Sequence, residues 1–294
     1  TWTSSWGAGH SHLQAHYAAA LRDGRLDGKP GGLSPQSVLH HHRMLSEALG
    51  HGMKWGLVGR NVAQAVDPPR PVHSEMSTLD SERVRRFLEA ARATVYYPMW
   101  HLDVFTGVRR SELLGLRWKD IDLDMAALSV VQVIHRLRDG RIIFQEPKTQ
   151  KGRRQVALGP SAVLGLRAHR DCQQALRAAL GAPLGDEDLV FSKPDGSPFL
   201  PDTVTHAFRR IADRVGLKGV RLHDLRHTHA SLMLRQGVHP KIVQERLGHS
   251  TIAVTLDTYS HVTPGLQEAA ALKFEEELAD APVDRTQEVP LTNR

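Results

Sequence analysis

Apolar side chains recur at helical spacing through most of the chain. Ser34-Pro35 is typical of a helix start, with a serine at the N-cap and proline in the first turn. The apolar positions that follow it at helical spacing are Val38, Leu45, Ala48, Leu49 and Met53. A shorter helix is expected between Leu13 and Leu21. Residues 1–67 are therefore predicted to form a small helical domain.

A proline-rich run, Asp67-Pro68-Pro69-Arg70-Pro71, ends this domain. Proline cannot continue a helix and favours a stiff, extended connection, so we expect a linker over residues 68–77. Beyond the linker, helical spacing returns at Val84, Phe87, Leu88 and Ala91.

The pattern changes between Ala127 and Leu158. Asp139-Gly140 is a strong hairpin signal, and it interrupts a series of strand-forming residues, namely Val130, Val131, Val133, Ile134, Ile142, Ile143 and Phe144. The sequence therefore predicts a small antiparallel β-sheet within a mainly α domain that spans residues 78–278.

From Thr203 onward the pattern is helical again, and particular residues mark where the helices begin and end. Gly237 and Gly248 are expected just past helix ends, Pro240 in a first turn and Ser250 at an N-cap. Residues 265–278 are apolar enough to pack against another surface, and packing on their own domain is one possibility. Residues 279–294 are polar, and we expect a disordered tail.

Composition limits the possible classes of function without choosing one. The chain has 294 residues and a net charge of +6, which suits a polyanionic partner but is also common in basic proteins without one. The single cysteine, Cys172, excludes an intramolecular disulfide and is expected to pack inside. No stretch is apolar enough for a membrane span and no signal pattern is visible, so we expect no membrane partner and a cytoplasmic protein. Because the chain begins at Thr1 rather than Met, we expect a fragment or a processed chain, truncated at the front of its first domain.

Five separated positions or runs carry groups suited to phosphate chemistry. They are Thr106-Gly107-Val108-Arg109-Arg110-Ser111-Glu112, Lys148, His223-Asp224-Leu225-Arg226, His249 and Tyr259. Guanidinium groups stabilise charge on a phosphate under attack, and imidazole or lysine moves protons. A tyrosine hydroxyl can form the covalent bond.

In kind and order these residues resemble the tyrosine recombinase (phage integrase) family, over roughly residues 34–275. The resemblance implies six catalytic roles. Arg109 and Arg226 would bind the scissile phosphate, Lys148 would protonate the leaving oxygen, His223 would exchange a proton with the nucleophile, His249 would donate to a non-bridging oxygen, and Tyr259 would be the nucleophile.

Other residues near these motifs are expected in supporting roles. Glu112 lies three residues after Arg109 and can orient it. Arg110 points away from Arg109 on a helix, and we expect it, with the loop residues Lys151, Arg153 and Arg154, to contact the DNA backbone. Lys151 is close enough in sequence to compete with Lys148 for the role of acid.

A metal site is the alternative for the histidines. His223 and His227 have the i, i+4 spacing of zinc ligands and His229 follows, but Arg226 between them would repel a metal ion. The triplet His40-His41-His42 does not converge on a helix, so we expect a polar or DNA-facing surface there. We therefore expect no metal and no cofactor.

The resemblance implies a two-domain clamp on double-stranded DNA attachment sites, with residues 1–67 as the core-binding domain. Four protomers would exchange strands through 3′-phosphotyrosyl links and a Holliday junction, and residues 265–278 would dock on a neighbouring protomer. Accessory DNA-bending or directionality proteins are candidate partners. Two alternatives stay open: a type IB topoisomerase-like enzyme that relaxes supercoils, and a DNA-binding relative without catalysis.

Overall fold

The computed structural model describes residues 9–71, 78–259, 271–275 and 278. The chain divides into two compact units, residues 1–75 and 76–294. Each unit has its own core and is described by itself.

The first unit is helical, as its sequence predicts. It contains α1 (Gly9–Asp23), α2 (Pro35–Lys54) and a 3₁₀ turn, η1 (Val62–Ala65). The Ser34 hydroxyl accepts a hydrogen bond from the Ser37 amide at 3.1 Å, so this serine is the N-cap of α2. The small core of the unit consists of Tyr17, Ala20, Val38 and Val66.

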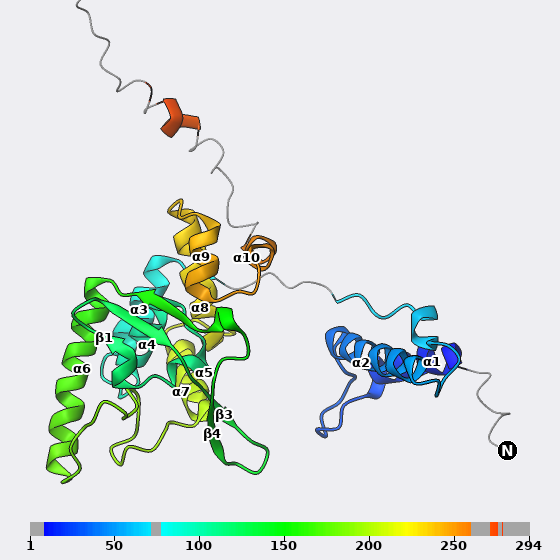
Figure 1. Cartoon of the computed structure of the whole chain (residues 1–294), viewed down its shortest axis with the longest axis horizontal. Coiled ribbons are helices and arrows are strands. Elements are labelled where there is room, and N and C mark those ends of the chain that lie inside the picture. The colour runs from blue at the N-terminus through cyan, green and yellow to red at the C-terminus, as the bar shows by residue number, and fades with distance from the viewer. Residues whose placement is uncertain (1–8, 72–77, 260–270, 276–277, 279–294) are drawn as a thin grey trace, which may run out of the picture. The chain divides into compact units, whose positions relative to one another are not determined.

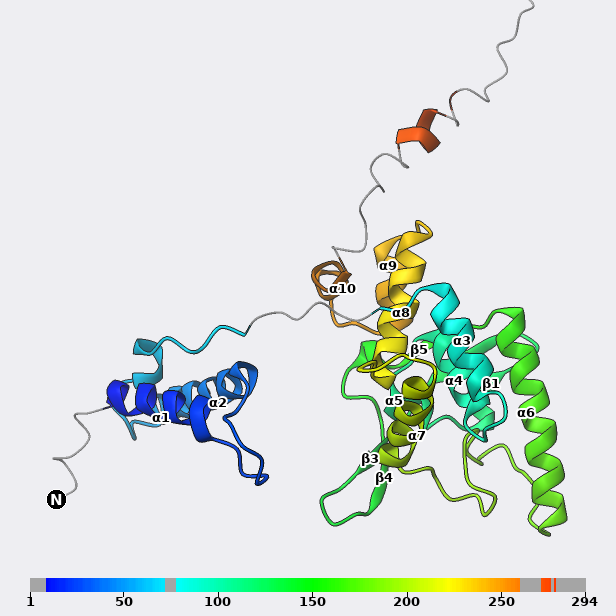
Figure 2. The same cartoon turned by 180° about the vertical axis from the view of Figure 1, so that it is seen from behind.

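The second unit is mainly α with small antiparallel sheets (Figures 1 and 2). Helix α4 lies between α6 and α8 and packs against both, while α9 and α10 pack together beside α8. The α-helices of this unit are α3 (Ser81–Ala91), α4 (Tyr97–Thr106), α5 (Arg110–Leu113), α6 (Pro160–Ala179), α7 (Pro201–Arg214), α8 (Leu222–Arg235), α9 (Pro240–Leu247) and α10 (Ile252–Tyr259).

The β segment forms two sheets in the described residues, where the sequence predicted one. Strands β1 (Ile121–Asp122), β2 (Ala127–Val130) and β5 (Arg154–Ala157) make an antiparallel sheet in the order β1-β2-β5. The predicted hairpin is a separate pair, β3 (Val133–Arg136) with β4 (Ile142–Gln145), which projects from the unit (Figure 1). Hydrophobicity could not separate β2 from β3, because only two residues divide them and apolar residues end the first strand and begin the second.

The main core joins α3, α4 and α7 to the β1-β2-β5 sheet. Phe87, Trp100 and Phe208 pack ring against ring, with centroids 4.7–5.9 Å apart. A smaller cluster of Ala230, Leu234, Val243, Leu247 and Tyr259 holds α8, α9 and α10 together. The placement of Tyr259 thus depends on the packing of α10 against these two helices.

The residues at the helix ends lie where the sequence predicted them, with one exception. Gly237 and Gly248 have positive φ past the ends of α8 and α9, and Pro240 opens α9. The expectation for Ser250 is wrong: α10 begins at Ile252, and the Thr251 hydroxyl lies 3.4 Å from the Val254 amide in the capping position.

Three further predictions concern Cys172, the C-terminal segment and membrane-spanning helices. Cys172 is exposed on α6, so it does not pack inside as expected. The tail 279–294 and most of segment 265–278 lie outside the described residues, and within that segment Leu272, Phe274 and Leu278 are exposed. Among the helices of the described chain, none has the length and apolar character needed to cross a membrane.

Candidate active site

Two glycine turns form the frame of the site. Gly107 ends α4 with φ +64°, and a Cβ there would lie 2.8 Å from atoms of His229 and Leu247. Gly248 ends α9 with φ +67°, and a Cβ there would lie 2.9 Å from the Arg154 guanidinium and the Lys151 carbonyl oxygen. Only glycine combines this conformation with such close approach, which is the physical reason for Thr-Gly and Leu-Gly in the two motifs.

Arg226 connects the two turns from inside α8. Its guanidinium donates to the Gly107 carbonyl at 2.6 Å and to the Leu247 carbonyl at 2.7 Å, and the residue is buried. Burial is the main cause that lowers the pKa of Arg226 to about 9, and the nearby Arg109 charge is the second. The side chain therefore remains protonated at neutral pH and is fixed before any phosphate binds.

Arg109 stands at the N-cap of α5 and is held by Glu112. The Arg109 guanidinium donates to the Glu112 carboxylate at 2.7 Å, and its amide donates to the same carboxylate at 2.8 Å. A third bond, at 3.2 Å, reaches the Gly248 carbonyl. Because the Arg109 side chain is still 38% exposed, part of its fork remains open to a ligand.

Arg154 does not occupy the position expected of a DNA contact. Its side chain is 6% exposed, and it donates to both Glu112 oxygens at 2.8 and 3.1 Å and to the Arg246 carbonyl at 2.7 Å. Strand β5 directs this side chain inward, which a loop interpretation of Lys148–Arg154 could not foresee. Burial alone would raise the pKa of Glu112, but hydrogen bonds from Arg154 and the charges of Arg154 and Arg109 lower it.

The other basic residues expected on DNA are exposed, each with a protein partner. Arg110 donates to the Thr205 hydroxyl at 2.6 Å, Lys151 donates to the Ser250 carbonyl at 2.6 Å, and Arg153 pairs with Glu146. All three can be reached by a large polyanion.

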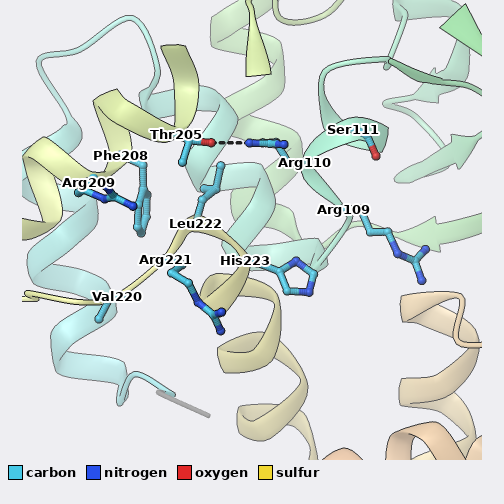
Figure 3. Close-up of a pocket in the computed structure, with 10 residues that line it drawn as sticks. All are labelled: Arg109, Arg110, Ser111, Thr205, Phe208, Arg209, Val220, Arg221, Leu222 and His223. Atoms are coloured by element: carbon cyan, nitrogen blue, oxygen red, sulfur yellow. Dashed lines mark hydrogen bonds between the residues drawn. The ribbon is translucent and has the colours of Figure 1, made fainter. Parts of the chain in front are cut away.

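Two clefts open beside Arg109. The first, of about 550 Å³, is bordered by α5, α7 and the start of α8 (Figure 3). Its lining carries four arginines, Arg109, Arg110, Arg209 and Arg221, together with His223. The second, of about 260 Å³, brings Lys148 to the same arginine, between Glu112, His135 and Gly248. Lys148 itself is exposed.

The two expected catalytic histidines are His223 and His249. His223 is exposed on the first turn of α8, at the wall of the first cleft (Figure 3). His249 follows Gly248, and its Nδ1 lies 2.8 Å from the Thr255 hydroxyl. Desolvation, with further cationic neighbours, lowers the pKa of each ring to about 4. Both imidazoles are therefore neutral at pH 7.

Tyr259 is buried at the end of α10, and its hydroxyl meets a different histidine from the one expected. The phenol oxygen lies 2.8 Å from His227 Nδ1. Burial raises the pKa of Tyr259 to about 12, partly offset by the Arg226 charge, so the resting hydroxyl is protonated. Within the described residues, Tyr259 and His223 share no hydrogen bond.

The histidines of the zinc alternative have other partners. His227 faces Tyr259, while His229 Nδ1 lies 2.9 Å from the Val104 carbonyl and its Nε2 accepts from Arg246 at 3.0 Å. No cluster of three His, Cys, Asp or Glu side chains suited to a metal occurs within the part of the chain that is described. His40 bonds to Gln36, and His42 to Tyr17, on and beside α2.

Sequence reasoning missed three features of the site. His227 was considered only as a metal ligand, and Arg209 and Arg221 were not singled out, although both border the first cleft. Asp103 is buried with one carboxylate oxygen unpartnered, and burial, opposed by the Arg226 charge, raises the pKa of its carboxyl well above the usual range.

Comparison with known proteins gives this geometry its context. Residues 77–265 match the model of the phage integrase family, which is more than half of the chain. The chain belongs to the phage integrase family. The predicted resemblance to tyrosine recombinases is thereby confirmed.

Relatives in this family include recombinases and mobile-element integrases. The chain is 30% identical over 217 residues to a XerC-like tyrosine recombinase of Caldanaerobacter subterraneus, covering 70% of this chain and 56% of that protein. It is 27% identical over 247 residues to the ICEBs1 integrase of Bacillus subtilis, covering 83% and 67%. The chain thus spans a little over half to two thirds of these relatives.

Solved structures share the fold. The Tn1549 transposon integrase in complex with a circular intermediate DNA has a TM-score of 0.72 at 23% identity, covering 90% of this chain and 85% of that one. A lambda integrase dimer bound to a core site has a TM-score of 0.53 at 19% identity, covering 85% and 69%. The predicted fold class, mainly α with small antiparallel sheets, is confirmed.

Proposed function

We propose that this protein is a site-specific DNA recombinase that breaks and rejoins strands through a 3′-phosphotyrosyl intermediate. The observation that carries the proposal is the anchoring of two arginines on one turn. Arg109 binds the Gly248 carbonyl, and Arg226 binds the adjoining Leu247 carbonyl. The Arg226 charge also acts on the Tyr259 hydroxyl, where it partly offsets the rise in pKa that burial causes.

In this proposal, each group has one task at the scissile phosphate. Arg109 and Arg226 stabilise the charge that develops on the non-bridging oxygens, and His249 donates a further hydrogen bond. Tyr259 attacks phosphorus, and Lys148 protonates the 5′-oxygen that leaves. The bond energy stays in the phosphotyrosyl link, so a 5′-hydroxyl can reverse the reaction without ATP, a metal or another cofactor.

The DNA backbone beside that phosphate would occupy the first cleft, where Arg209 and Arg221 add positive charge. Residues 1–67 would serve as the core-binding domain, with 68–77 as linker and 78–278 as catalytic domain. The two domains would clamp attachment-site DNA in the cytoplasm. Four protomers would resolve a Holliday junction, with accessory proteins where the DNA must bend.

The alternatives differ in a measurable product. A type IB topoisomerase-like enzyme would relax supercoiled plasmid without pairing two sites. A non-catalytic relative would bind DNA and cleave nothing. The family relatives named as recombinases and integrases favour the first proposal.

A nicked suicide substrate tests the proposal. Cleavage near the nick releases a short strand and leaves the protein attached to DNA after SDS denaturation. The intact chain should form this adduct in EDTA, and Tyr259→Phe should bind the same DNA but form none. Adduct formation by Tyr259→Phe, or a strict requirement for a divalent metal, would refute the assignment.

A further inference from the structure

The contact between Tyr259 and His227 assigns a proton acceptor that the family resemblance does not. The phenol oxygen lies 2.8 Å from His227 Nδ1, within ordinary hydrogen-bond distance. The same imidazole lies edge-on to the His223 ring, with centroids 4.8 Å apart. His227 therefore contacts both the nucleophile and the histidine expected to serve it.

We propose that His227, rather than His223, accepts the proton of Tyr259 when the phenol attacks phosphorus. This inference rests on the proposed function and names a further catalytic residue within it. It follows from position, because His227 touches the reacting oxygen and shares α8 with Arg226, the adjacent residue.

The resting protonation states are those from which this transfer must start. Burial raises the pKa of Tyr259, so the phenol is still protonated before it attacks phosphorus. Desolvation, opposed by the Asp224 charge, lowers the pKa of His227, so the imidazole is neutral and has one free acceptor nitrogen. With the ring N–H at Nε2, which is the tautomer that the proposal requires, the hydroxyl donates to Nδ1.

The step balances within the site. The Tyr259 O–H bond breaks and its proton moves to His227 Nδ1, while the phenol oxygen bonds to phosphorus. The bond from phosphorus to the 5′-oxygen breaks, and that oxygen takes the proton of Lys148. In rejoining, the 5′-hydroxyl returns its proton to lysine, and His227 returns its proton to the departing phenol.

His223 has a weaker claim on this role. It is exposed at the wall of the first cleft, where it faces the position proposed for the DNA backbone. From there it can donate a hydrogen bond to a phosphate oxygen, whereas the hydrogen bond to the phenol in the described residues is made by His227. We therefore place His223 with the phosphate ligands.

The experiment compares variants of the full chain on two suicide substrates, one ordinary and one with sulfur in place of the 5′-leaving oxygen. Sulfur leaves without a proton, so the second substrate isolates the nucleophile from the lysine. His227→Gln keeps a hydrogen-bond acceptor but no base. It should form adduct about 100-fold more slowly than the unmodified chain on both substrates.

The controls distinguish a base from other roles. His206→Gln alters an exposed α7 histidine that borders neither cleft, and it should react at the unmodified rate. Replacing the tyrosines by 3-fluorotyrosine makes the phenol more acidic, so it should shrink the His227→Gln defect. A merely structural role would leave that defect unchanged. His227→Asn is the second variant, and thermal unfolding checks that each variant folds.

The opposing results are specific. An adduct rate for His227→Gln equal to that of the unmodified chain overturns the inference and leaves the proposed function intact. A faster rate also overturns it, because the contact would then hold Tyr259 back. If the unmodified chain forms no adduct, the proposed function fails and the inference falls with it.

Discussion

Two cationic regions lie beside the same cleft and are built in opposite ways. In the arginine cluster, Arg226 and Arg154 are buried, and carbonyl oxygens or Glu112 fix each guanidinium. In the lysine loop, residues 147–153, Lys148 is exposed and Lys151 reaches the Ser250 carbonyl from an exposed position. One region is held rigid by the fold, while the other presents its charges to solvent.

The difference matches the chemistry proposed for each region. Charge stabilisation is strongest when donors are fixed before the reaction, because no reorganisation is then needed. A proton donor must approach the leaving oxygen and must give up its proton, which suits a lysine on a loop. The predictions below separate these two kinds of contribution.

The largest effect is expected from Arg226→Ala. This change removes a fixed donor to the non-bridging oxygens, so adduct formation should fall about 1000-fold or more. The sulfur-containing substrate should not restore it, because the leaving group is not what the arginine serves. Single-turnover cleavage of both substrates measures this, and full restoration by sulfur would contradict the fixed-charge role.

Glu112→Gln should lower the free energy of unfolding by about 3 kcal/mol, because it leaves the buried Arg154 without its counter-charge. Urea unfolding at pH 7 measures the loss. Glu146→Gln is the matched control, since the Glu146–Arg153 pair is 73% and 54% exposed and should contribute below about 1 kcal/mol. Equal losses of unfolding free energy in the two variants would contradict the contrast between a buried and an exposed ion pair.

The contact between Glu112 and Arg154 predicts that stability depends on pH. The folded pKa of Glu112 lies below its unfolded value, so the carboxylate contributes stability above the unfolded pKa. That contribution is lost as the pH falls through the folded pKa. The stability gap between the unmodified chain and Glu112→Gln should therefore narrow on acidification.

Lys148→Ala should slow cleavage of ordinary DNA about 100-fold. The sulfur-containing substrate should restore most of the rate, in contrast to Arg226→Ala. If sulfur instead restores Lys151→Ala and not Lys148→Ala, the acid is Lys151.

The smallest effect is expected from Lys151→Ala, which removes one phosphate contact. Binding should weaken modestly, and the slope of log affinity against log salt should decrease by about 0.9. Filter binding over a salt series measures the slope. An unchanged slope would place Lys151 away from the DNA.

The sequence predicted what depends on local pattern and spacing. Helix caps at Ser34, Gly237 and Gly248 follow from backbone chemistry, and the Arg109–Glu112 contact follows from three-residue spacing. The separation of the strands into two sheets, the inward direction of Arg154 and the meeting of His227 with Tyr259 depend on long-range packing. No pattern within one segment contains that information.

The central claim is that Tyr259 carries the DNA strand, and mass spectrometry of the trapped adduct tests it most directly. After protease and nuclease digestion, the proposed mechanism predicts a residual nucleotide joined through its 3′-phosphate to the peptide that contains Tyr259, with a free 5′-hydroxyl on the released strand. A nucleotide on any other residue, or a 5′-phosphate link, would contradict it.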